Sequence, residues 1–445
     1  MHNNRYLYWI TFVAVNGGLM FGLNMGGIAG ATHMIREGFN LTDGGLGTVA
    51  ALLTVGCLAG ALFTGRFADR YGRKKVMLAT AVLYIVSALG CALAPGVALL
   101  NLFRLTSGLA VGATSVVAPM YISEISPAAR RGRLVSFNQF AITIGILLAY
   151  AFDFLLADLG PGSWRYMLAV PAAFGVLYLV FLCTTLPESP RWLLARGRRD
   201  EALQVMRRIG GEAFAAADTA EIERSLRDER KCEKVRLGEL FRGRTGYVVL
   251  IGTLLAALQQ ITGINAVIMF APDIFEAAGV GGDTALANAM LVGLVNFLMT
   301  IVALWLVDMA GRKSLLLWGA AGMVASLGFL TWQFALPVQN HLAVLVALLV
   351  YIAFFAASFS PVMWVVISEI YPTRIKALAM SFSTAVSWGC TFLTVQFTPV
   401  ISMAGMQWLF GAFGLLSLAA FVFVRVWIPE TKGKTLEQIG TGLGL

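Results

Sequence analysis

Six amide side chains and two tryptophans lie inside long apolar stretches of this 445-residue chain. An amide both donates and accepts hydrogen bonds, and an indole ring offers a flat apolar face. Together these groups suit a neutral ligand that carries many hydroxyls and a few C–H faces. Because a buried amide is costly in lipid unless it is satisfied, so many of them favour a shared cavity over separate packing contacts. The candidates are Asn24, Gln139, Gln259, Gln260, Asn265, Asn296, Trp364 and Trp388.

Asn24 and Arg104 are expected to lie close enough to touch inside the apolar region. Counted inward from the ends of their stretches, both lie about 10 Å deep at ~1.5 Å per residue of helix. An amide does not titrate, so Asn24 cannot carry a proton. Asp153 is the only acid well inside an apolar stretch, and it lies near one end. We interpret Asp153 first as a partner for a helix end, and the proton-carrier interpretation stays open.

Short charged motifs occur twice along the chain. Residues 69–74 (DRYGRK) return at 308–313 (DMAGRK), 122–125 (ISEI) at 367–370, and Pro187-Glu188 at Pro429-Glu430. Such repeats predict two homologous membrane halves with a substrate site between them. Ion pairs in these loops would close a gate on one side and break when the halves rock, because a gate needs contacts that exist in one state only. The gate candidates are Asp69, Arg73, Glu124, Arg131, Asp308, Arg312, Glu369 and Lys376.

The composition indicates that helices crossing a membrane position these side chains. Hydrophobic residues make up 58% of the chain and charged residues 13%, which is about half the usual share of charge. Twelve apolar runs approach the ~20 residues that span the hydrocarbon core. We therefore predict an all-α membrane protein with twelve transmembrane helices in two six-helix bundles. The runs are about 7–31, 46–64, 76–95, 98–122, 134–157, 165–185, 246–271, 284–307, 315–336, 342–369, 378–403 and 406–428.

The net charge of +9 is unevenly distributed. Of the 33 Lys and Arg residues, only Arg36 and Arg165 fall in the opposite set of loops, and only Arg104 falls inside a run. By the positive-inside rule, both termini and the long central loop are predicted to be cytoplasmic, in a multi-pass protein of the cell membrane. The basic residues thus record topology, and they do not indicate nucleic-acid binding.

The predicted organisation has four parts. An N-terminal bundle covers 1–186, a polar insert 187–244, a C-terminal bundle 245–428 and a short tail 429–445. Apolar residues of the insert recur at three- and four-residue steps, which predicts short amphipathic helices against the membrane face. The insert would act either as a latch between the halves or as a solvated tether.

Five motifs in order resemble the sugar porter family of the major facilitator superfamily. They are 65–74 (GRFADRYGRK), 119–124 (PMYISE), 187–192 (PESPRW), 259–265 (QQITGIN) and 429–433 (PETKG). The resemblance covers essentially the whole chain, and the family includes bacterial xylose and glucose proton symporters and animal glucose facilitators. One departure is Lys376-Ala377, where the family usually has Arg-Gly. The Lys ammonium is a compact charge, whereas the Arg guanidinium is a planar group with several donors. The gate contact made by Lys376 should therefore be weaker than one made by Arg.

The resemblance also implies a sugar site. Residues that hold the sugar in relatives match Gln139, Gln259, Gln260, Asn265, Asn296 and Trp364, while Trp388 matches a pocket tryptophan and Phe21 an aromatic neighbour. Three positions depart from the family: Met269 replaces a frequent Tyr, Ser387 an Asn or Gln, and Ser360 a Gly. Sugar choice is therefore expected to differ from that of relatives.

Symporters of this family carry Asp at the position of Asn24, where it takes the proton and pairs with an Arg matching Arg104. We therefore predict uncoupled facilitated diffusion of a hexose or pentose by alternating access. The alternative is a sugar:proton symporter, in which Asn24 is an engineered neutralisation or Asp153 carries the proton. A sugar-sensing receptor is a remote alternative, because only residues 429–445 follow the last run.

Enzymatic chemistry is not indicated. The sequence has no phosphate-binding loop, no metal-ligand cluster and no Ser-His-Asp set at membrane depth, so we predict neither catalysis nor a cofactor. An exporter of organic anions would need central cations, and only Arg104 qualifies. The expected partners are a small sugar, the lipid bilayer and, in the symport alternative, protons. One chain holds a complete pathway and should function as a monomer.

Overall fold

The computed structural model describes residues 4–127, 130–231, 237–241, 243–372 and 375–432. Helices make up 88% of the structure, and no strand occurs among the described residues. A search of that part of the chain finds twelve helical segments long and apolar enough to cross a membrane, as the sequence predicts. In lipid a helix is favoured because it satisfies its own backbone groups.

Among its described residues, the N-terminal half contains seven α-helices and the short 3-10 helices η1 and η3. Gly22 and Gly145 allow close approach of the helices that carry them, because a β-carbon on either would overlap the other helix's backbone. The elements are α1 (Asn4–Gly26), η1 (Ala29–Ala31), α2 (Thr32–Gly38), α3 (Asp43–Tyr71), α4 (Arg73–Leu93), α5 (Val97–Ile125), α6 (Arg131–Leu156), η3 (Ala157–Leu159) and α7 (Ser163–Thr184).

The C-terminal half repeats this plan and is joined to the first half by a helical insert. The insert contains α8 (Pro190–Ala195), α9 (Arg199–Gly210), α10 (Glu212–Lys231) and η4 (Leu237–Phe241). The second half contains α11 (Gly243–Ile261), α12 (Ile264–Met269), α13 (Ala271–Ala277), α14 (Gly282–Ala310), α15 (Arg312–Ala335), α16 (His341–Ala357), α17 (Phe359–Ile370), α18 (Lys376–Met403) and α19 (Met406–Trp427).

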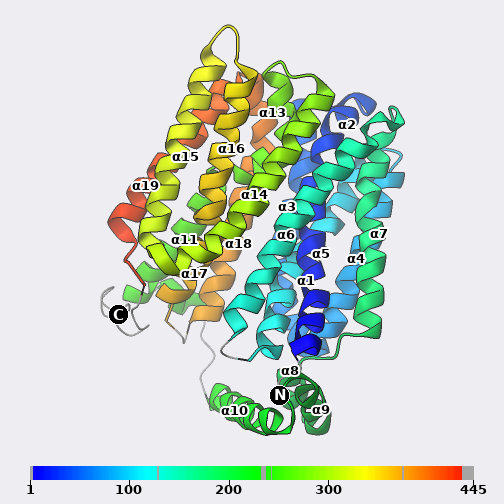
Figure 1. Cartoon of the computed structure of the whole chain (residues 1–445), viewed down its shortest axis with the longest axis vertical. Coiled ribbons are helices and arrows are strands. Elements are labelled where there is room, and N and C mark those ends of the chain that lie inside the picture. Colours follow the sequence, from blue (N-terminus) through cyan, green and yellow to red (C-terminus); the bar gives the residue numbers. More distant parts are fainter. Residues whose placement is uncertain (1–3, 128–129, 232–236, 242, 373–374, 433–445) are drawn as a thin grey trace.

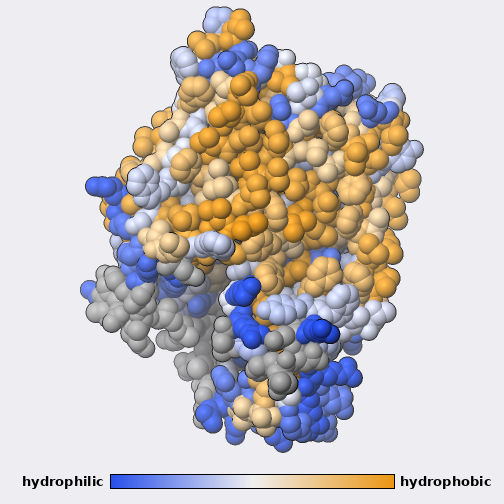
Figure 2. Space-filling model, viewed as in Figure 1, coloured by the Kyte–Doolittle hydropathy of each residue, from blue (hydrophilic) through white to orange (hydrophobic). Residues whose placement is uncertain are grey.

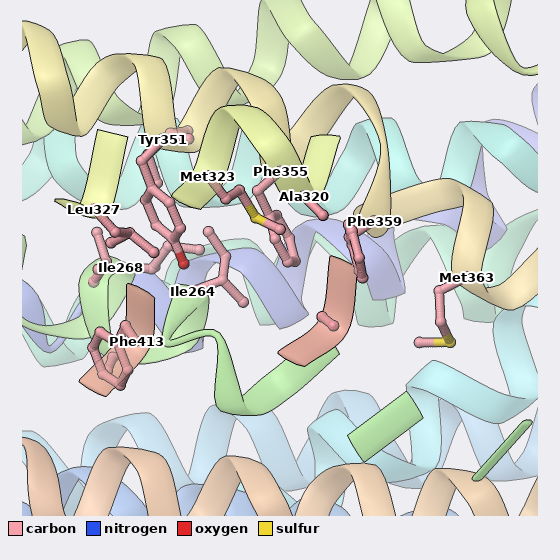
Figure 3. Packing of buried hydrophobic residues seen from close by; sticks show 14 of the residues in the cluster. Ile264, Ile268, Ala320, Met323, Leu327, Tyr351, Phe355, Phe359, Met363 and Phe413 are labelled. Carbon is pink, nitrogen blue, oxygen red and sulfur yellow. The ribbon is translucent and has the colours of Figure 1, made fainter. Parts of the chain in front are cut away.

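The two halves stand side by side, and each has its own buried apolar core (Figure 1). In the C-terminal half, Met323, Tyr351, Phe355 and Phe359 converge from α15, α16 and α17 (Figure 3). The insert and both ends of the described chain lie at one end of the molecule, which we call the insert side, and α2 and α13 lie at the opposite end, the far side (Figure 1).

The surface between these ends is apolar. Figure 2 shows a broad hydrophobic band with hydrophilic residues gathered at the insert side and, more thinly, at the far side. Large side chains such as Trp305, Trp318 and Leu415 are about 70% exposed, at 74%, 72% and 69%. So much exposed apolar surface would be unstable in water and is stable against lipid tails. The band therefore marks the part of the protein that lies within the membrane.

The insert packs on the N-terminal half. Leu193 and Val205 join the apolar core of that half. The Trp192 ring N–H donates to the Asp69 carbonyl at 2.9 Å, and Arg196 donates to the carbonyl of Arg70 at 2.7 Å. The predicted amphipathic pattern appears in α9, where apolar residues are buried and charged ones face outward.

Three of the predicted continuous spans are broken. The first stops at Gly26 and resumes through η1 and α2, the seventh breaks between α11 and α12, and the tenth breaks at Ser358. In the seventh, Gly263 takes a left-handed φ of 95°, which only glycine adopts cheaply. Hydropathy averages over such breaks, so the pattern of apolar runs does not show them.

Candidate functional site

Gln260 is the centre of a network of polar side chains in the C-terminal half. Its side-chain N–H₂ donates to Ser387 Oγ at 3.0 Å and to Gln259 Oε1 at 3.2 Å. Its oxygen accepts from Asn265 Nδ2 at 2.7 Å. The break at Gly263 allows Asn265, on α12, to turn back toward Gln260 at the end of α11. Three predicted amides and one hydroxyl thus meet at a single point, with Gln260 and Asn265 only half-buried.

Gln259 has a different environment from Gln260. Its side chain is buried, and its N–H₂ donates to the carbonyl of Phe359 at 2.9 Å, beside the break between α16 and α17. That donor is therefore committed to holding two broken helices together. Its oxygen faces Gln260, so Gln259 orients the network rather than offering both of its groups to a ligand.

The N-terminal half contributes Gln139 and Phe21 to contacts with the opposite half. Gln139 Nε2 donates to Ser360 Oγ at 3.3 Å, and the Phe21 ring lies 5.9 Å from the Trp388 ring. Ser360 and Ser387, two of the three positions that depart from the family, therefore each receive an amide donor. Met269, the third, is fully buried in the core of the N-terminal half, so it joins the halves by apolar packing.

The described hydrogen bonds do not join the two remaining candidates to this network. Asn296 is buried in α14, where its carbonyl accepts from Thr300 at 2.8 Å. Trp364, on α17, is partly buried against the core of the C-terminal half.

Asn24 and Arg104 meet, but not through their side chains. Asn24 Oδ1 accepts from Ser107 Oγ at 2.5 Å, and its N–H₂ donates to the Met20 carbonyl at 2.7 Å. Arg104 reaches only backbone: Nη1 donates to the Asn24 carbonyl at 3.4 Å, and Nε to the Val49 carbonyl at 3.2 Å. The expected proximity is present, and the amide binds a hydroxyl instead of the guanidinium.

Asp153 is buried beside η1. Its Oδ2 accepts from the backbone N–H of Gly30 at 2.9 Å, so it is a partner for a helix end.

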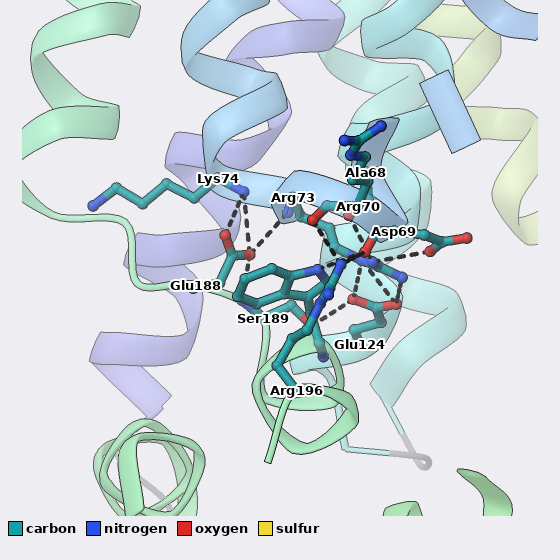
Figure 4. A network of polar contacts seen from close by, with 10 residues as sticks. Ala68, Asp69, Arg70, Arg73, Lys74, Glu124, Glu188, Ser189 and Arg196 are labelled. Carbon is teal, nitrogen blue, oxygen red and sulfur yellow. Dashed lines mark hydrogen bonds and ion pairs between the residues drawn. The ribbon is translucent and has the colours of Figure 1, made fainter. Parts of the chain in front are cut away.

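On the insert side, Arg73 anchors the gate candidates of the N-terminal half (Figure 4). Its guanidinium donates two hydrogen bonds to Glu124, from Nη2 at 2.8 Å and from Nε at 2.9 Å. Its Nη1 lies 3.1 Å from Asp69 Oδ1. Arg73 and Glu124 are both buried, whereas Asp69 is mostly exposed. These charges are paired within one half.

The corresponding pair in the C-terminal half is looser. Arg312 Nη2 lies 3.4 Å from Glu369 Oε1, while Arg312 Nε and Glu369 Oε2 are buried without a described hydrogen-bond partner. Arg131 is exposed and Lys376 half-exposed. The side chain of Asp308 lies outside the described residues.

Glu188 and Glu430 hold the starts of two equivalent helices, a role that the sequence pattern did not reveal. Glu188 accepts from the backbone N–H groups of Arg73 and Lys74, and Glu430 from those of Arg312 and Lys313. A carboxylate at a helix N-terminus satisfies free N–H groups and the helix dipole. Burial raises the pKa of Glu188. Burial also acts to raise the pKa of Glu430, but the hydrogen bonds from backbone N–H groups outweigh it, and the pKa of Glu430 is lowered. The repeated Pro-Glu was the available signal.

On the far side, hydrogen bonds join the two halves. Thr32 Oγ1 lies 2.8 Å from Asp273 Oδ2, Tyr150 donates to the carbonyl of Ile268 at 2.6 Å, and Gln396 Nε2 donates to the carbonyl of Gly44 at 3.1 Å. Burial raises the pKa of Asp273 to about 7. No pattern in the sequence pairs these residues, because each pair joins chain segments that are far apart.

The described part of the chain has twelve membrane-length helical segments in two repeated halves, a polar network near the interface of the halves and ion pairs at one end. These features define a membrane transporter of the major facilitator fold. Metal-ligand clusters are absent from the described part of the chain. The chain belongs to the family described as "Sugar (and other) transporter", whose model matches residues 10–443. It is a multi-pass protein of the plasma membrane and not an enzyme.

Known relatives agree with this family. The D-xylose-proton symporter of Escherichia coli (strain K12) is 35% identical, over 98% of this chain and 96% of its own length. The major myo-inositol transporter IolT of Bacillus subtilis (strain 168) is 36% identical, over 98% and 93%. The partially occluded inward-open conformation of the E. coli xylose transporter XylE has a TM-score of 0.86 and 33% identity, covering 97% of this chain and 100% of that one.

Proposed function

We propose that this protein carries a hexose or pentose across the membrane by alternating access, without obligatory proton movement. The observation that carries the uncoupled proposal is the environment of Asn24. Its amide is engaged by Ser107 and by the Met20 carbonyl, and it offers no titratable group beside Arg104. A proton has no carrier at the position that symporters use.

The Gln260 network supports a sugar as the ligand. Amides that are already oriented by one another keep their remaining hydrogen-bonding capacity pointed in fixed directions, which reduces the ordering cost of binding. A sugar hydroxyl can accept from one amide and donate to the next. Phe21 and Trp388 place aromatic surface at the same interface between halves, suited to the C–H face of a ring.

The described arrangement is closed on the far side. The hydrogen bonds of Thr32, Tyr150 and Gln396 bring the halves together there. We propose that the insert side is cytoplasmic, since most Lys and Arg residues lie in that set of loops. The arrangement then faces the cytoplasm, which agrees with its similarity to an inward-open relative.

In the outward-facing state the charged loops of the two halves would approach each other. Arg73 and Glu124 would keep their mutual contact, and the Arg312–Glu369 pair, which has an unused donor and an unused acceptor, would accept new partners. Because its pathway is contained in one chain, the protein would work as a monomer.

Counterflow of labelled xylose and glucose in proteoliposomes tests transport directly. We expect exchange by the wild type, weaker exchange by Gln260→Ala, and normal exchange by Gln339→Ala, whose side chain contacts the Leu336 carbonyl on the far-side loop. Equal exchange by both variants would remove the Gln260 network from the site, and no exchange of any pentose or hexose by the wild type would overturn the proposal.

Symport is the second candidate function, because Asp153 is a buried acid and buried acids in membranes often serve proton relays. Its carboxylate accepts from the backbone N–H of Gly30, a role as partner of a helix end that does not require proton exchange. If symport were observed, Asp153→Asn should abolish the coupling; coupling that survives this change would exclude Asp153 as the carrier.

A further inference from the structure

Arg104 is a buried cation with no carboxylate partner among the described residues. Its side chain is 2% exposed, and Nη2 has no hydrogen-bond partner among the described residues. The titratable groups that interact with it electrostatically are the thiols of Cys91 and Cys57, which are neutral near pH 7. Arginine cannot release its proton to escape this situation. An unpaired guanidinium inside a bundle of membrane helices is among the costliest groups that a protein can bury.

A small cavity adjoins this guanidinium. Its volume is about 10 Å³, and its lining comes from α1, α4, α5 and α7 in the far-side part of the N-terminal half. The polar groups that line it belong to Arg104, Ser107 and Asn24, and the rest of its wall is mostly apolar. This is about the smallest space that holds one water molecule, so a larger ion such as chloride requires the wall to move outward. Met167, a flexible side chain in the wall, can shift to admit a somewhat larger ion.

The chemistry of this cavity selects a small anion. The guanidinium of Arg104 lines it with a free donor, whereas no Asp or Glu lines it, and Ser107 and Asn24 are hydrogen-bonded to each other. A monovalent halide would neutralise Arg104 and accept a hydrogen bond from the free Nη2. A sugar is too large, and a cation would be repelled by the guanidinium.

We propose that this cavity binds chloride or a similar small monovalent anion, which takes the electrostatic place of a carboxylate at position 24. The site lies within one half, away from the Gln260 network. The bound ion would stabilise the packing of α1 against α5 and would not itself need to be transported.

Thermal unfolding of the purified full-length protein in detergent tests this site. Sodium chloride is titrated against sodium gluconate at constant ionic strength, with no sugar present. We expect a saturable upward shift in melting temperature with chloride, reproduced by bromide. Asn24→Asp supplies a carboxylate from the protein, so this variant should melt at a higher temperature in gluconate and respond little to chloride. Asn24→Ser, the neutral control at the same position, should keep the chloride response.

Ser107→Asp brings a carboxylate to the same cavity from α5 and replaces Asn24→Asp if that variant does not fold. A wild-type protein without a saturable chloride response overturns the proposal whatever the variants do. An equal response in wild type and in a folded carboxylate variant also overturns it, since the ion would then bind elsewhere. Because sugar is absent from this assay, either failure leaves the proposed transport function standing.

Discussion

Gly47 is expected to control how tightly the far side closes. It lies on α3 against the backbone of Gln396 on α18, so the contact joins the two halves. A β-carbon at Gly47 would lie under 3.0 Å from the Gln396 carbonyl oxygen, whereas ordinary contact begins at 3.4 Å. Gly47→Ala must therefore push the helices apart by at least 0.4 Å, the difference between these values, in the closed arrangement only.

The size of the effect follows from the cost of overpacking, which is typically about 1–3 kcal/mol. A cost of this size in one state shifts the population between states by about 5- to 150-fold. We expect Gly47→Ala to favour the arrangement that is open on the far side, and the larger Gly47→Val to favour it further. Sugar binding from the insert side should weaken to the same extent.

Double electron–electron resonance between spin labels at positions 159 (Leu159) and 338 (Val338) measures this opening. The five native cysteines are first replaced so that only these two positions are labelled. Both positions are exposed, at 59% and 82%, and lie on the far side of opposite halves. Gly65→Ala is the matched control: it is on the same helix, and its β-carbon meets nothing within 4 Å. Both substitutions gain similar helix propensity, so their difference isolates the contact between halves. Identical distance distributions for Gly47→Ala and Gly65→Ala would refute the reasoning.

Three further predictions follow from the polar contacts. Gln260→Ala should weaken sugar binding by about 5- to 30-fold, since it removes a ligand group and frees Asn265; calorimetric affinity within twofold of the wild type would contradict this. Glu124→Gln should slow exchange while leaving sugar affinity nearly unchanged, because it holds Arg73 less firmly in the loop that approaches the other half when the insert side closes; an unchanged turnover rate would exclude a gating role. Lowering the pH from 8 to 5 should shorten far-side distances in the wild type but not in Asp273→Asn, and identical pH responses would exclude Asp273.

The sign of this pH effect follows from burial. The Asp273 carboxyl has a pKa of about 7 when the far side is closed and should return toward ~3.9 when water reaches it. The closed arrangement therefore holds more protons, gains relative stability as pH falls through this window, and loses it as pH rises toward 7. Since the proton enters and leaves from the same side, Asp273 would regulate the gate without carrying protons across the membrane.

Sequence patterns predicted the framework because hydropathy, charge bias and internal repeats are properties of the chain itself. Twelve spans and two halves follow from them, and the meeting of Gln259, Gln260 and Asn265 was foreseen from residue type. The pattern of apolar runs does not show the break at Gly263, because a glycine with positive φ interrupts a helix without changing its mean hydropathy. Pairs such as Thr32 with Asp273 depend on how two halves dock, and no local period encodes that contact.

The unequal halves also needed the structure. Arg73 donates hydrogen bonds to Glu124 from both Nε and Nη2. Arg312 and Glu369 are further apart, and each keeps a buried polar atom without a described partner. Repetition in sequence predicted equivalent residues, but the spacing of two side chains depends on the packing around each copy.

The central claim is that sugar moves without a coupled proton, because Asn24 replaces the acid that would carry it. Sugar accumulation in proteoliposomes with an imposed inward proton gradient tests this most directly. The account predicts that internal sugar rises only to the external concentration, with or without the gradient. Accumulation above the external concentration, driven by protons and abolished by a protonophore, would contradict it.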